Sequence, residues 1–323
     1  MTRMPVFRSL QDIPATFGPC VATIGNFDGV HSGHQWVIAE VIQRAQALGI
    51  RSIAVTFEPH PVRVLRPELS PKLITPLAQK LELLGTTGID AVLVLPFTLA
   101  MSQMSARQFA AGILRDGLHA VEVHEGENFR FGHGAEAGVE SLGSLGRELG
   151  FGVHVYAPRM LRGEAVSSSR IRQLLVEGDV SRARPLLGRA FAVEGRPAAG
   201  RGFGTRYAVP TINLAAYDEL LPANGVYITC LQVGEEPFQS VTNVGNRPTF
   251  GEDSFAVESH LLHFHPIDLQ ADTPLTLTFL KRLREEQKWP STAALLEQIQ
   301  QDVARAQNYF RLARAMGLPQ FLP

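Results

Sequence analysis

Residues 25–34 read Gly25-Asn26-Phe27-Asp28-Gly29-Val30-His31-Ser32-Gly33-His34. An apolar run at 21–24 precedes this stretch, and a helical pattern of apolar residues follows it over 34–48. The segment is therefore expected to lead from a strand, through a glycine-rich turn, into the N-terminus of a helix. Glycines let the backbone approach a ligand closely, and a helix N-terminus attracts anions. Histidines at such a turn can hydrogen-bond phosphate oxygens, so we expect a nucleotide whose phosphates react.

His31 and His34 have a second interpretation, as two ligands of a zinc site. The only cysteines, Cys20 and Cys230, lie far apart in sequence, and no carboxylate has an obvious ligand spacing to the pair. Phosphate binding is therefore favoured over metal ligation. A glycine-rich turn that binds nothing stays open, because such turns are common between strands and helices.

The composition is that of a globular protein large enough for two domains. The chain has 323 residues, of which 45% are hydrophobic and 19% charged, and its formal net charge is −1. This balance gives no argument for nucleic acid or an anionic membrane as a partner. The polar start is unlike a signal peptide, and no apolar stretch is long enough to span a membrane. Two cysteines do not indicate a disulfide framework. Together these observations lead us to expect a cytoplasmic protein. The sequence does not indicate its oligomeric state.

The first half of the chain alternates between apolar β-rich runs and helical patterns. Continuous apolar strands between helices are typical of a parallel sheet buried on both faces. We therefore predict a Rossmann-like, doubly wound α/β domain, which binds ligands at the carboxyl ends of its strands. The expected strands are 21–24, 52–57, 91–95, 120–123 and 153–156, and the expected helices are 34–48, 76–87, 105–115, 139–149 and 169–177.

From about residue 190 the pattern changes to short strands and dense turns. We predict a mainly β domain, an antiparallel barrel or sandwich, that closes with one helix. Ser291 is the expected N-cap of that helix, and Gly317 with Pro319 is expected to end it. The alternation of the first half stops at Leu187, so we predict domains 1–187 and 188–323. The expected strands are 225–233, 240–244, 256–262 and 275–281, and the apolar stripe of the helix is Leu295, Ile299, Val303 and Phe310.

The complete pattern Gly-x-Phe-Asp-Gly-x-His-x-Gly-His resembles the signature of the adenylyltransferase half of bacterial bifunctional riboflavin kinase/FAD synthetases. These enzymes belong to the wider His-x-Gly-His nucleotidyltransferase superfamily, and the Phe-Asp-Gly insertion narrows the choice to the flavin branch. The resemblance implies that His31 and His34 are catalytic. It also implies ATP or phosphate contacts for Gly25, Asn26, Phe27, Asp28, Gly29 and Gly33.

Two loops after predicted strands also resemble segments of this family. Thr56-Phe57-Glu58-Pro59-His60-Pro61 would on its own be a strand exit into a proline-restricted loop. Gly126-Glu127-Asn128-Phe129-Arg130-Phe131-Gly132 resembles the family's Gly-x-Asp/Asn-Phe-x-Phe-Gly loop, although its phenylalanines alone would be assigned to the core. Aromatic rings stack readily on a planar isoalloxazine. The resemblance implies phosphate or metal contact for Asn128 and flavin contact for Phe57, Pro59, His60, Phe129 and Phe131.

Ser167-Ser168-Ser169-Arg170-Ile171-Arg172 precedes the last predicted helix of the first half. Serines before a helix are usually caps, which accounts for one or two of them but not for the arginine. The segment resembles the family's Ser-Ser-Thr-x-Ile-Arg motif, with Ser169 where threonine is usual. The resemblance implies that Ser168 and Ser169 bind the triphosphate and that Arg172 clamps it.

The second half resembles riboflavin kinases. Pro210-Thr211-Ile212-Asn213 follows a glycine-rich stretch and resembles the family's Pro-Thr-Ala-Asn motif. The resemblance implies that Thr211 and Asn213 hold Mg²⁺ and the ATP phosphates, with Gly202 and Gly204 in the phosphate loop. Mg²⁺ takes few protein oxygens and relies on substrate phosphates for the rest, so such a pair is a sensible site.

Glu258 aligns with the catalytic base of these kinases, although by itself it would be a solvated strand residue. An alcohol nucleophile needs help to lose its proton, and a positioned carboxylate supplies that help. The segment Leu283-Arg284-Glu285-Glu286-Gln287-Lys288-Trp289 resembles the family's closing motif and implies flavin contacts for Arg284 and Glu286. The departures from the family pattern concentrate in this half, at Thr205, Ala208, Val209 and His263.

About eight motifs in the family's order imply an enzyme that uses ATP and Mg²⁺ in two steps, from riboflavin to FMN in the second half and from FMN to FAD in the first. The FMN phosphate is ionised near neutral pH, so adenylyl transfer needs positioning and charge stabilisation but no general base. Two alternatives stay open: only the adenylyltransferase is active, or the chain is a flavin-binding protein with dead sites. The joint presence of the reactive residues counts against the last.

Overall fold

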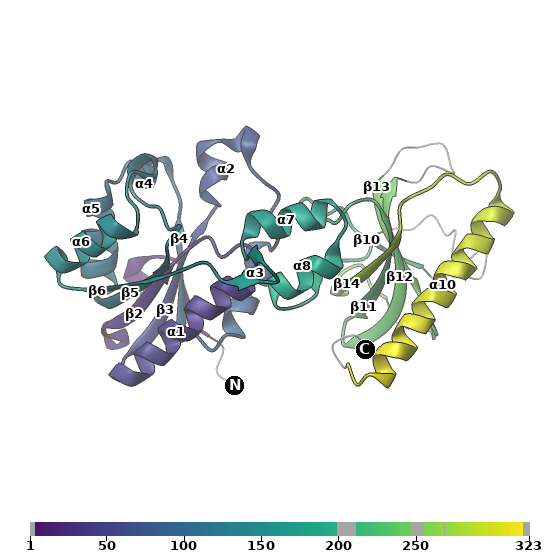
Figure 1. The fold of residues 1–323 in the computed structure, drawn as a ribbon, viewed down its shortest axis with the longest axis horizontal. Coiled ribbons are helices and arrows are strands. Elements are labelled where there is room, and N and C mark those ends of the chain that lie inside the picture. The colour runs from purple at the N-terminus through teal and green to yellow at the C-terminus, as the bar shows by residue number, and fades with distance from the viewer. Residues whose placement is uncertain (1–3, 199–210, 247–254, 268, 319–323) are drawn as a thin grey trace. The chain divides into compact units, whose positions relative to one another are not determined.

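The computed structural model of the chain describes residues 4–198, 211–246, 255–267 and 269–318. The chain divides into two compact units, Met1–Ser168 and Ser169–Pro323. Most elements of both units are labelled in Figure 1.

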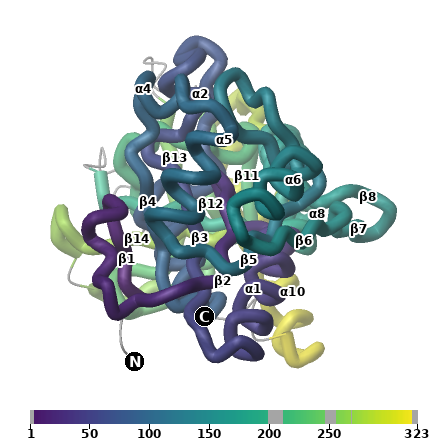
Figure 2. The backbone as a smooth tube through the Cα atoms, turned by 90° about the vertical axis from the view of Figure 1, so that its left-hand side faces the viewer, coloured from purple at the N-terminus to yellow at the C-terminus, as the bar shows by residue number. Residues whose placement is uncertain are grey.

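The first unit is built on a six-stranded sheet whose strands are all parallel. Its order is β1-β4-β3-β2-β5-β6, and the labels in Figure 2 run in this order from left to right. The order reverses between β2 and β5, which is where a doubly wound sheet binds its ligands. The predicted α/β fold is therefore confirmed. The strands are β1 Val6–Phe7, β2 Cys20–Ile24, β3 Arg51–Glu58, β4 Ala91–Pro96, β5 Ala120–Gly126 and β6 Gly152–Tyr156.

Helices cover both faces of this sheet, as its continuous apolar strands predict. Along β3, Ile53 and Val55 join a core with α5 and α6, whereas Ala54 joins another with Ile38 of α1 and Leu84 of α3. Figure 1 shows these two pairs of helices on opposite sides of the sheet. The helices are α1 Ser32–Leu48, α2 Pro61–Leu65, α3 Leu77–Gly85, α4 Leu99–Ser102, α5 Ala106–Phe109 and α6 Val139–Leu149, with 3-10 turns at Leu10–Asp12, Ala15–Phe17, Pro67–Leu69 and His133–Ala135.

Some elements of the first unit differ from the sequence expectations. The expected helix 105–115 is α5, which continues as a π-helix over Ala110–Gly117. The short elements β1, α2 and the hairpin of β7 Met160–Leu161 and β8 Glu164–Ala165 are additions. Elements this short show no periodicity in sequence, so they cannot be predicted from the apolar pattern.

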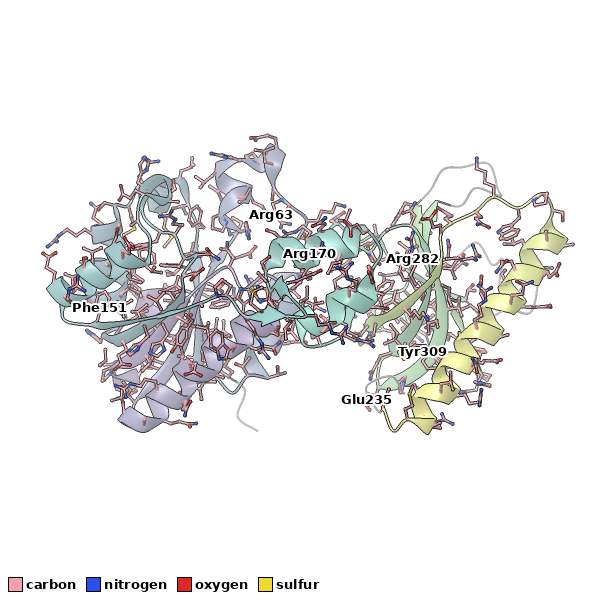
Figure 3. All side chains as sticks on the ribbon, viewed as in Figure 1. Arg63, Phe151, Arg170, Glu235, Arg282 and Tyr309 are labelled. Carbon is pink, nitrogen blue, oxygen red and sulfur yellow. The ribbon has the colours of Figure 1, made fainter. Side chains whose placement is uncertain are left out.

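Two helices, α7 Ser168–Val176 and α8 Val180–Leu187, connect the first sheet to the second. The sequence does not predict α8, because Pro185 inside it argues against a helix. The Leu175 carbonyl of α7 accepts from the N–H of Ala223, just before β11, at 3.0 Å, and α8 packs on β14. Arg282 of β14, labelled in Figure 3, donates to the carbonyl of Glu177, which lies between the two helices.

The second unit contains an antiparallel six-stranded sheet of order β10-β13-β12-β11-β14-β9. Beyond β9, the Ala198 N–H donates to the Asn213 carbonyl of β10, and the Ala215 N–H donates to the Arg196 carbonyl, both at 2.8 Å. These bonds join the two outer strands, so the sheet closes as a barrel rather than a sandwich. The strands are β9 Phe191–Gly195, β10 Thr211–Leu214, β11 Gly225–Val233, β12 Glu236–Asn246, β13 Phe255–Leu261 and β14 Leu275–Arg284.

The long helix α10, Thr292–Ala315, covers one outer face of the barrel. Ser291 caps it, as predicted, by accepting from the Ala294 N–H at 3.2 Å. Phe310 and Val303 of the predicted stripe pack on the outward side chains of β11 and β12. The helix ends before Gly317, as predicted, and Pro319 lies outside the described residues.

Candidate functional site

The glycine-rich turn follows β2 and leads into α1, as the sequence predicts. Phe27 and Val30 have positive φ angles of 47° and 37°, and Gly29 has a φ of 83°. A β-branched residue rarely adopts such a conformation, so the turn holds strain that the packing around it must outweigh. Gly33 leaves room for a ring, since a Cβ there would lie 3.2 Å from the imidazole of His31.

The two histidines of the turn stack on each other, with ring centroids 3.5 Å apart and an interplanar angle of 15°. His31 caps α1, because its Nδ1 accepts from the His34 N–H at 3.2 Å. A neutral His31 therefore carries its proton on Nε2. Burial, together with the charges of His31 and Lys80, lowers the pKa of His34 well below its usual value. Among the described residues, the buried His34 Nδ1 has no hydrogen-bond partner.

A loop before α3 holds the turn from inside the protein. The buried Asp28 carboxylate accepts from the N–H groups of Ile74 and Thr75, at 2.9 and 3.1 Å. The Thr75 hydroxyl accepts from the Gly29 N–H at 3.0 Å. The carboxylate of Asp28 therefore shapes the turn, and the direct phosphate contact expected for this residue stays a prediction.

Lys80 is a residue of this region that sequence reasoning missed. Its Nζ donates to the Asn26 carbonyl and to the Thr56 hydroxyl, both at 3.1 Å. The available signal is its position on α3, three residues after Leu77 and four before Leu84, which is a place on the apolar stripe of the helix.

The N-terminus of α7 begins at the same turn. The Ser168 hydroxyl donates to the Asp28 carbonyl at 2.8 Å, and Arg159 donates to the Ser32 carbonyl at 3.1 Å. Ser168 is therefore held at the glycine-rich turn, 140 residues away in sequence, and the phosphate contact expected for it stays a prediction. Ser169 and Arg172 follow it within the first turns of α7.

The end of β3 carries the first group of expected flavin contacts. Phe57 is partly buried and meets Phe97 edge to face at 5.8 Å between ring centroids. The Glu58–Pro59 peptide bond is cis. His60 caps α2, since its Nδ1 accepts from the Val62 N–H at 3.3 Å.

The loop after β5 carries the second group. Asn128 is exposed in the turn that follows the strand. Phe129 is half-buried and stacks on Phe131 with ring centroids 5.4 Å apart. Phe131 is buried in the core against Phe109, so Phe129 is the ring of this pair that remains accessible to a ligand.

Glu125, near the end of β5, is a buried carboxyl group that the sequence does not reveal. The backbone pairing of β2 with β5 stops at Ala22. Beyond it, Glu125 Oε1 accepts from the Ile24 N–H at 2.5 Å. Burial raises the pKa of Glu125 well above its usual value. Its side chain therefore satisfies the backbone where the two strands separate at the reversal of strand order.

In the barrel, strand pairing brings three predicted kinase residues together. Asn213 of β10 lies directly opposite Glu258 of β13, and Thr211 lies two residues before Asn213 on the same face. Asn243 of β12 lies opposite Glu258 on the other side, a neighbour that sequence reasoning missed. Oxygen-bearing side chains thus cluster on the face of the barrel that carries Glu258.

The residues expected at the end of β14 are held by the protein. Arg284 donates to the buried carboxylate of Asp302 in α10 at 2.9 Å. Glu286 lies against Gly245, where a Cβ would clash with its carboxylate, and accepts from the Asn224 amide at 3.3 Å. Among the described residues, its buried Oε1 has no partner.

The remaining predicted positions are the two glycines of the kinase phosphate loop and the departures from the family pattern. Gly202, Gly204, Thr205, Ala208 and Val209 lie outside the described residues. His263, the other departure from the family pattern, is exposed in the turn after β13 with a φ of 55°.

Within the described ranges, Glu122, His124 and His154 are the one group of three side chains that could share a metal ion. Arg44 of α1 donates to both carboxylate oxygens of Glu122, at 2.7 and 2.8 Å, so Glu122 is already engaged in an ion pair. The interpretation of His31 and His34 as metal ligands gains no support, because neither belongs to such a group.

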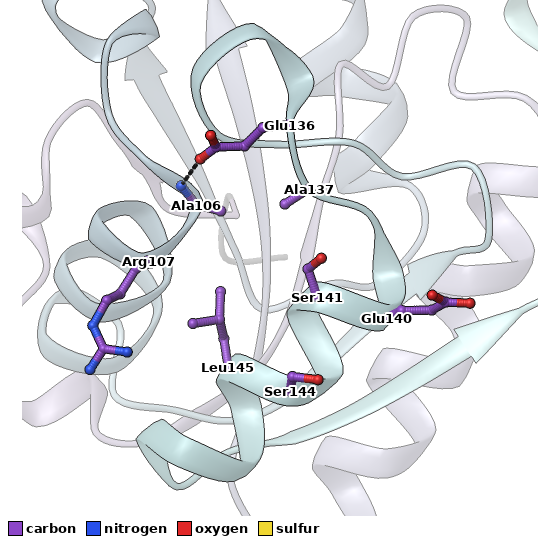
Figure 4. Close-up of a pocket in the computed structure, with 8 residues that line it drawn as sticks. All are labelled: Ala106, Arg107, Glu136, Ala137, Glu140, Ser141, Ser144 and Leu145. Carbon is purple, nitrogen blue, oxygen red and sulfur yellow. Dashed lines mark hydrogen bonds between the residues drawn. The ribbon is translucent and has the colours of Figure 1, made fainter.

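A surface pocket of about 650 Å³ lies between α5 and α6 (Figure 4). In it, Glu136 accepts from the Ala106 N–H at 2.8 Å. None of the predicted site residues lines it. The turn at 25–34 and the oxygen-bearing face of the barrel therefore remain the candidate sites.

Both parts of the chain match known families. Residues 13–170 match the family model for FAD synthetase, and residues 187–310 match the one for riboflavin kinase. The chain is 37% identical to the bifunctional riboflavin kinase/FMN adenylyltransferase of Pseudomonas fluorescens, over 94% of this chain and 97% of that protein. It is 32% identical to the bifunctional riboflavin kinase/FMN adenylyltransferase of Escherichia coli strain K12, over 91% of this chain and 94% of that protein.

The fold also has a solved counterpart. The crystal structure of a macrolide-efflux protein from Streptococcus pneumoniae superposes with a TM-score of 0.84 and 24% identity, over 94% of this chain and 99% of that one. At this identity the likeness concerns the fold alone. Searched over its described residues, the structure has no helix both long and apolar enough to cross a membrane.

Proposed function

The chain belongs to the bifunctional riboflavin kinase/FMN adenylyltransferase family, and from this premise we propose that its second unit phosphorylates riboflavin to FMN and its first unit adenylylates FMN to FAD. Both catalytic domains are present, and ATP is the co-substrate of each. The observation that carries the proposal is the pairing of each matched region with its own reactive cluster, the stacked histidines in one and the Asn213–Glu258 pair in the other.

In the first unit, an FMN phosphate oxygen forms a bond to the α-phosphorus of ATP while the bond to pyrophosphate breaks. We propose that His31 donates from Nε2 to a phosphate oxygen, beside the backbone N–H groups at the start of α1. His34, kept neutral by its lowered pKa, has a buried Nδ1 with no protein partner among the described residues, which a bound substrate can satisfy.

We base the other proposed contacts on the family motifs. The α7 N-terminus supplies Ser168, Ser169 and Arg172 to the triphosphate. For the flavin, we propose that Phe129 offers its exposed side to the ring system while Phe131 supports it from the core. Phe57, Pro59 and His60, at the end of β3, complete the proposed flavin site.

In the second unit, the terminal hydroxyl oxygen of riboflavin bonds to the γ-phosphorus of ATP, and ADP leaves. We propose that Glu258 takes the proton of that hydroxyl. Among the described residues its carboxylate makes no hydrogen bond, so it is available as a base. The buried, unpartnered Oε1 of Glu286 is a fitting acceptor for a flavin donor, while Arg284 positions this segment through Asp302.

Mg²⁺ fits the oxygen-bearing face beside Glu258. Thr211 and Asn213 lie on one face of β10, and hydroxyl and amide oxygens are ligands that this ion accepts. When bound, Mg²⁺ neutralises charge on the phosphates. We propose Asn128, at the carboxyl end of β5, as the corresponding contact in the first unit. Free thiols at Cys20 and Cys230, together with the use of ATP, fit a cytoplasmic enzyme.

Incubating the purified chain with riboflavin, ATP and Mg²⁺, and then separating the flavins, tests the proposal. We expect both FMN and FAD. FAD formed only from supplied FMN would identify an enzyme with a silent kinase, and bound but unchanged flavin would contradict both activities.

A further inference from the structure

Lys80 is a buried lysine that none of the motifs explains. It lies on α3 with 5% of its surface exposed, and both of its hydrogen bonds go to the segments that frame the glycine-rich turn. Thr56, at the carboxyl end of β3, accepts from Lys80 and donates to the same Asn26 carbonyl at 3.3 Å. Lys80 and Thr56 therefore form a two-point clamp on the carbonyl of the Asn26–Phe27 peptide in the turn.

The surroundings of Lys80 are built for a positive charge. A buried cation is costly unless hydrogen bonds and opposite charges compensate it. Burial lowers the pKa of Lys80, and the carboxylates of Glu58 and Asp28 oppose this shift. An ammonium group has three N–H donors, and the third makes no hydrogen bond to any residue that the structure describes.

The clamped carbonyl directly precedes the strained part of the turn, where Phe27 and Val30 have positive φ angles. Strained conformations persist only when neighbouring contacts hold them. We propose that Lys80 is a positioning residue for adenylyl transfer, which fixes the Asn26 carbonyl and thereby the turn that presents His31 and His34 to the reacting phosphates. This inference rests on the proposed activity of the first unit.

The charge of Lys80 has a second, separable effect. It is one of the causes that lower the pKa of His34, after burial and the charge of His31. Removing it should raise the pKa of His34, and this readout does not depend on catalysis.

The test uses the full chain and three variants. Lys80→Met keeps an unbranched side chain but removes the donors and the charge. Thr56→Val removes one contact of the clamp and keeps the charge. Arg147→Met removes a cation from the exposed face of α6, remote from the turn, and serves as the control. FMN adenylylation and riboflavin phosphorylation are measured separately, and His34 is titrated by NMR with His34→Gln for assignment.

For Lys80→Met we expect kcat of FMN adenylylation to fall roughly 10- to 10²-fold, the scale on which small misplacements act, with little change in the KM for ATP. Riboflavin phosphorylation should be unchanged, and the pKa of His34 should rise. Thr56→Val should lower kcat by a smaller factor without moving that pKa, and Arg147→Met should change neither.

An adenylylation rate in folded Lys80→Met equal to that of the parent would overturn the inference. If this variant does not fold, Thr56→Val decides, since an unchanged kcat there contradicts the clamp. A parent chain that makes no FAD from FMN would instead contradict the proposed function, so the two failures are distinguishable.

Discussion

At the residue scale, contacts with the backbone prepare side chains for chemistry. His31 caps α1 with its Nδ1 as the hydrogen-bond acceptor, so a neutral His31 carries its proton on Nε2. Burial, followed by the charges of His31 and Lys80, lowers the pKa of the stacked His34, which favours its neutral form. In the barrel, the register of β10 with β13, rather than a local motif, places Asn213 opposite Glu258.

Replacing both His31 and His34 by alanine should abolish FAD formation while FMN formation continues. The loss should be at least about 10²-fold, the scale for removing a preorganised group that stabilises developing charge. Flavin separation after incubation with FMN and ATP measures it. A folded double variant that makes FAD within a few-fold of the parent rate would show that these rings do not stabilise the reacting phosphates.

Glu258→Gln keeps the shape of the side chain and removes its basicity. FMN formation should slow by roughly 10²- to 10⁴-fold, the usual range for a general base, with FMN adenylylation unchanged. Glu235→Gln, on the exposed turn between β11 and β12 and labelled in Figure 3, is the matched control. Steady-state kinetics of each step measures both variants, and equal rates in the two would remove Glu258 from its proposed role.

At the scale of elements, ion pairs join helices to interior strands of the two sheets. Arg44 of α1 binds Glu122 of β5, and Arg284 of β14 binds Asp302 of α10. The first pair lies one strand from the glycine-rich turn and holds α1, whose N-terminus carries both histidines.

The Arg44–Glu122 pair should make stability depend on pH. The hydrogen bond from Arg44 lowers the pKa of Glu122 from 4.5 to about 2. A carboxyl whose folded pKa is depressed stabilises the protein above its unfolded value, and this contribution is lost as the pH falls from about 4.5 toward 2. Because the Arg44 side chain is 43% exposed, solvent screening reduces the effect, so Glu122→Gln should cost no more than about 1 kcal/mol at neutral pH.

Urea unfolding at pH 7 and at pH 3 checks this expectation. The difference in stability between the parent and Glu122→Gln should shrink at the lower pH. An equal difference at both values would show that the pair contributes by packing and not by charge.

At the scale of the whole molecule, the chain is two units with separate cores. The division at Ser168 assigns α7 and α8 to the unit of the barrel, through contacts such as that of Leu175 with Ala223. The domain boundary predicted from the sequence, after Leu187, stays a prediction, and it leaves α7 and α8 with the first domain. The two divisions therefore differ in whether α7 and α8 are assigned to the unit that contains the barrel.

A fragment of residues 188–323 should fold and phosphorylate riboflavin without the first unit. A fragment of residues 169–323 should have the same activity and a higher melting temperature, because α8 buries Val180, Ala183 and Leu187. Circular dichroism melts and flavin separation compare the two. A folded 188–323 fragment that is inert toward riboflavin, beside an active longer fragment, would move the functional boundary to Ser168.

The sequence by itself predicts what depends on neighbouring residues. Alternating apolar runs predict the parallel sheet, and the glycine-rich stretch before a helical pattern predicts the turn of His31 and His34, because backbone preference and periodicity act over a few residues. The resemblance of motifs extends this to the family, which the relatives confirm.

Only the tertiary structure decides what depends on distant segments. Lys80 meets Asn26 across 54 residues and Glu125 meets Ile24 across 101, and closure of the barrel depends on pairing between β10 and the segment that follows β9. The sequence places Lys80 on the apolar stripe of a helix but does not show which groups compensate its burial, because those contacts come from elsewhere in the chain. Folding therefore determines which charged side chains support the turn and which remain in solvent.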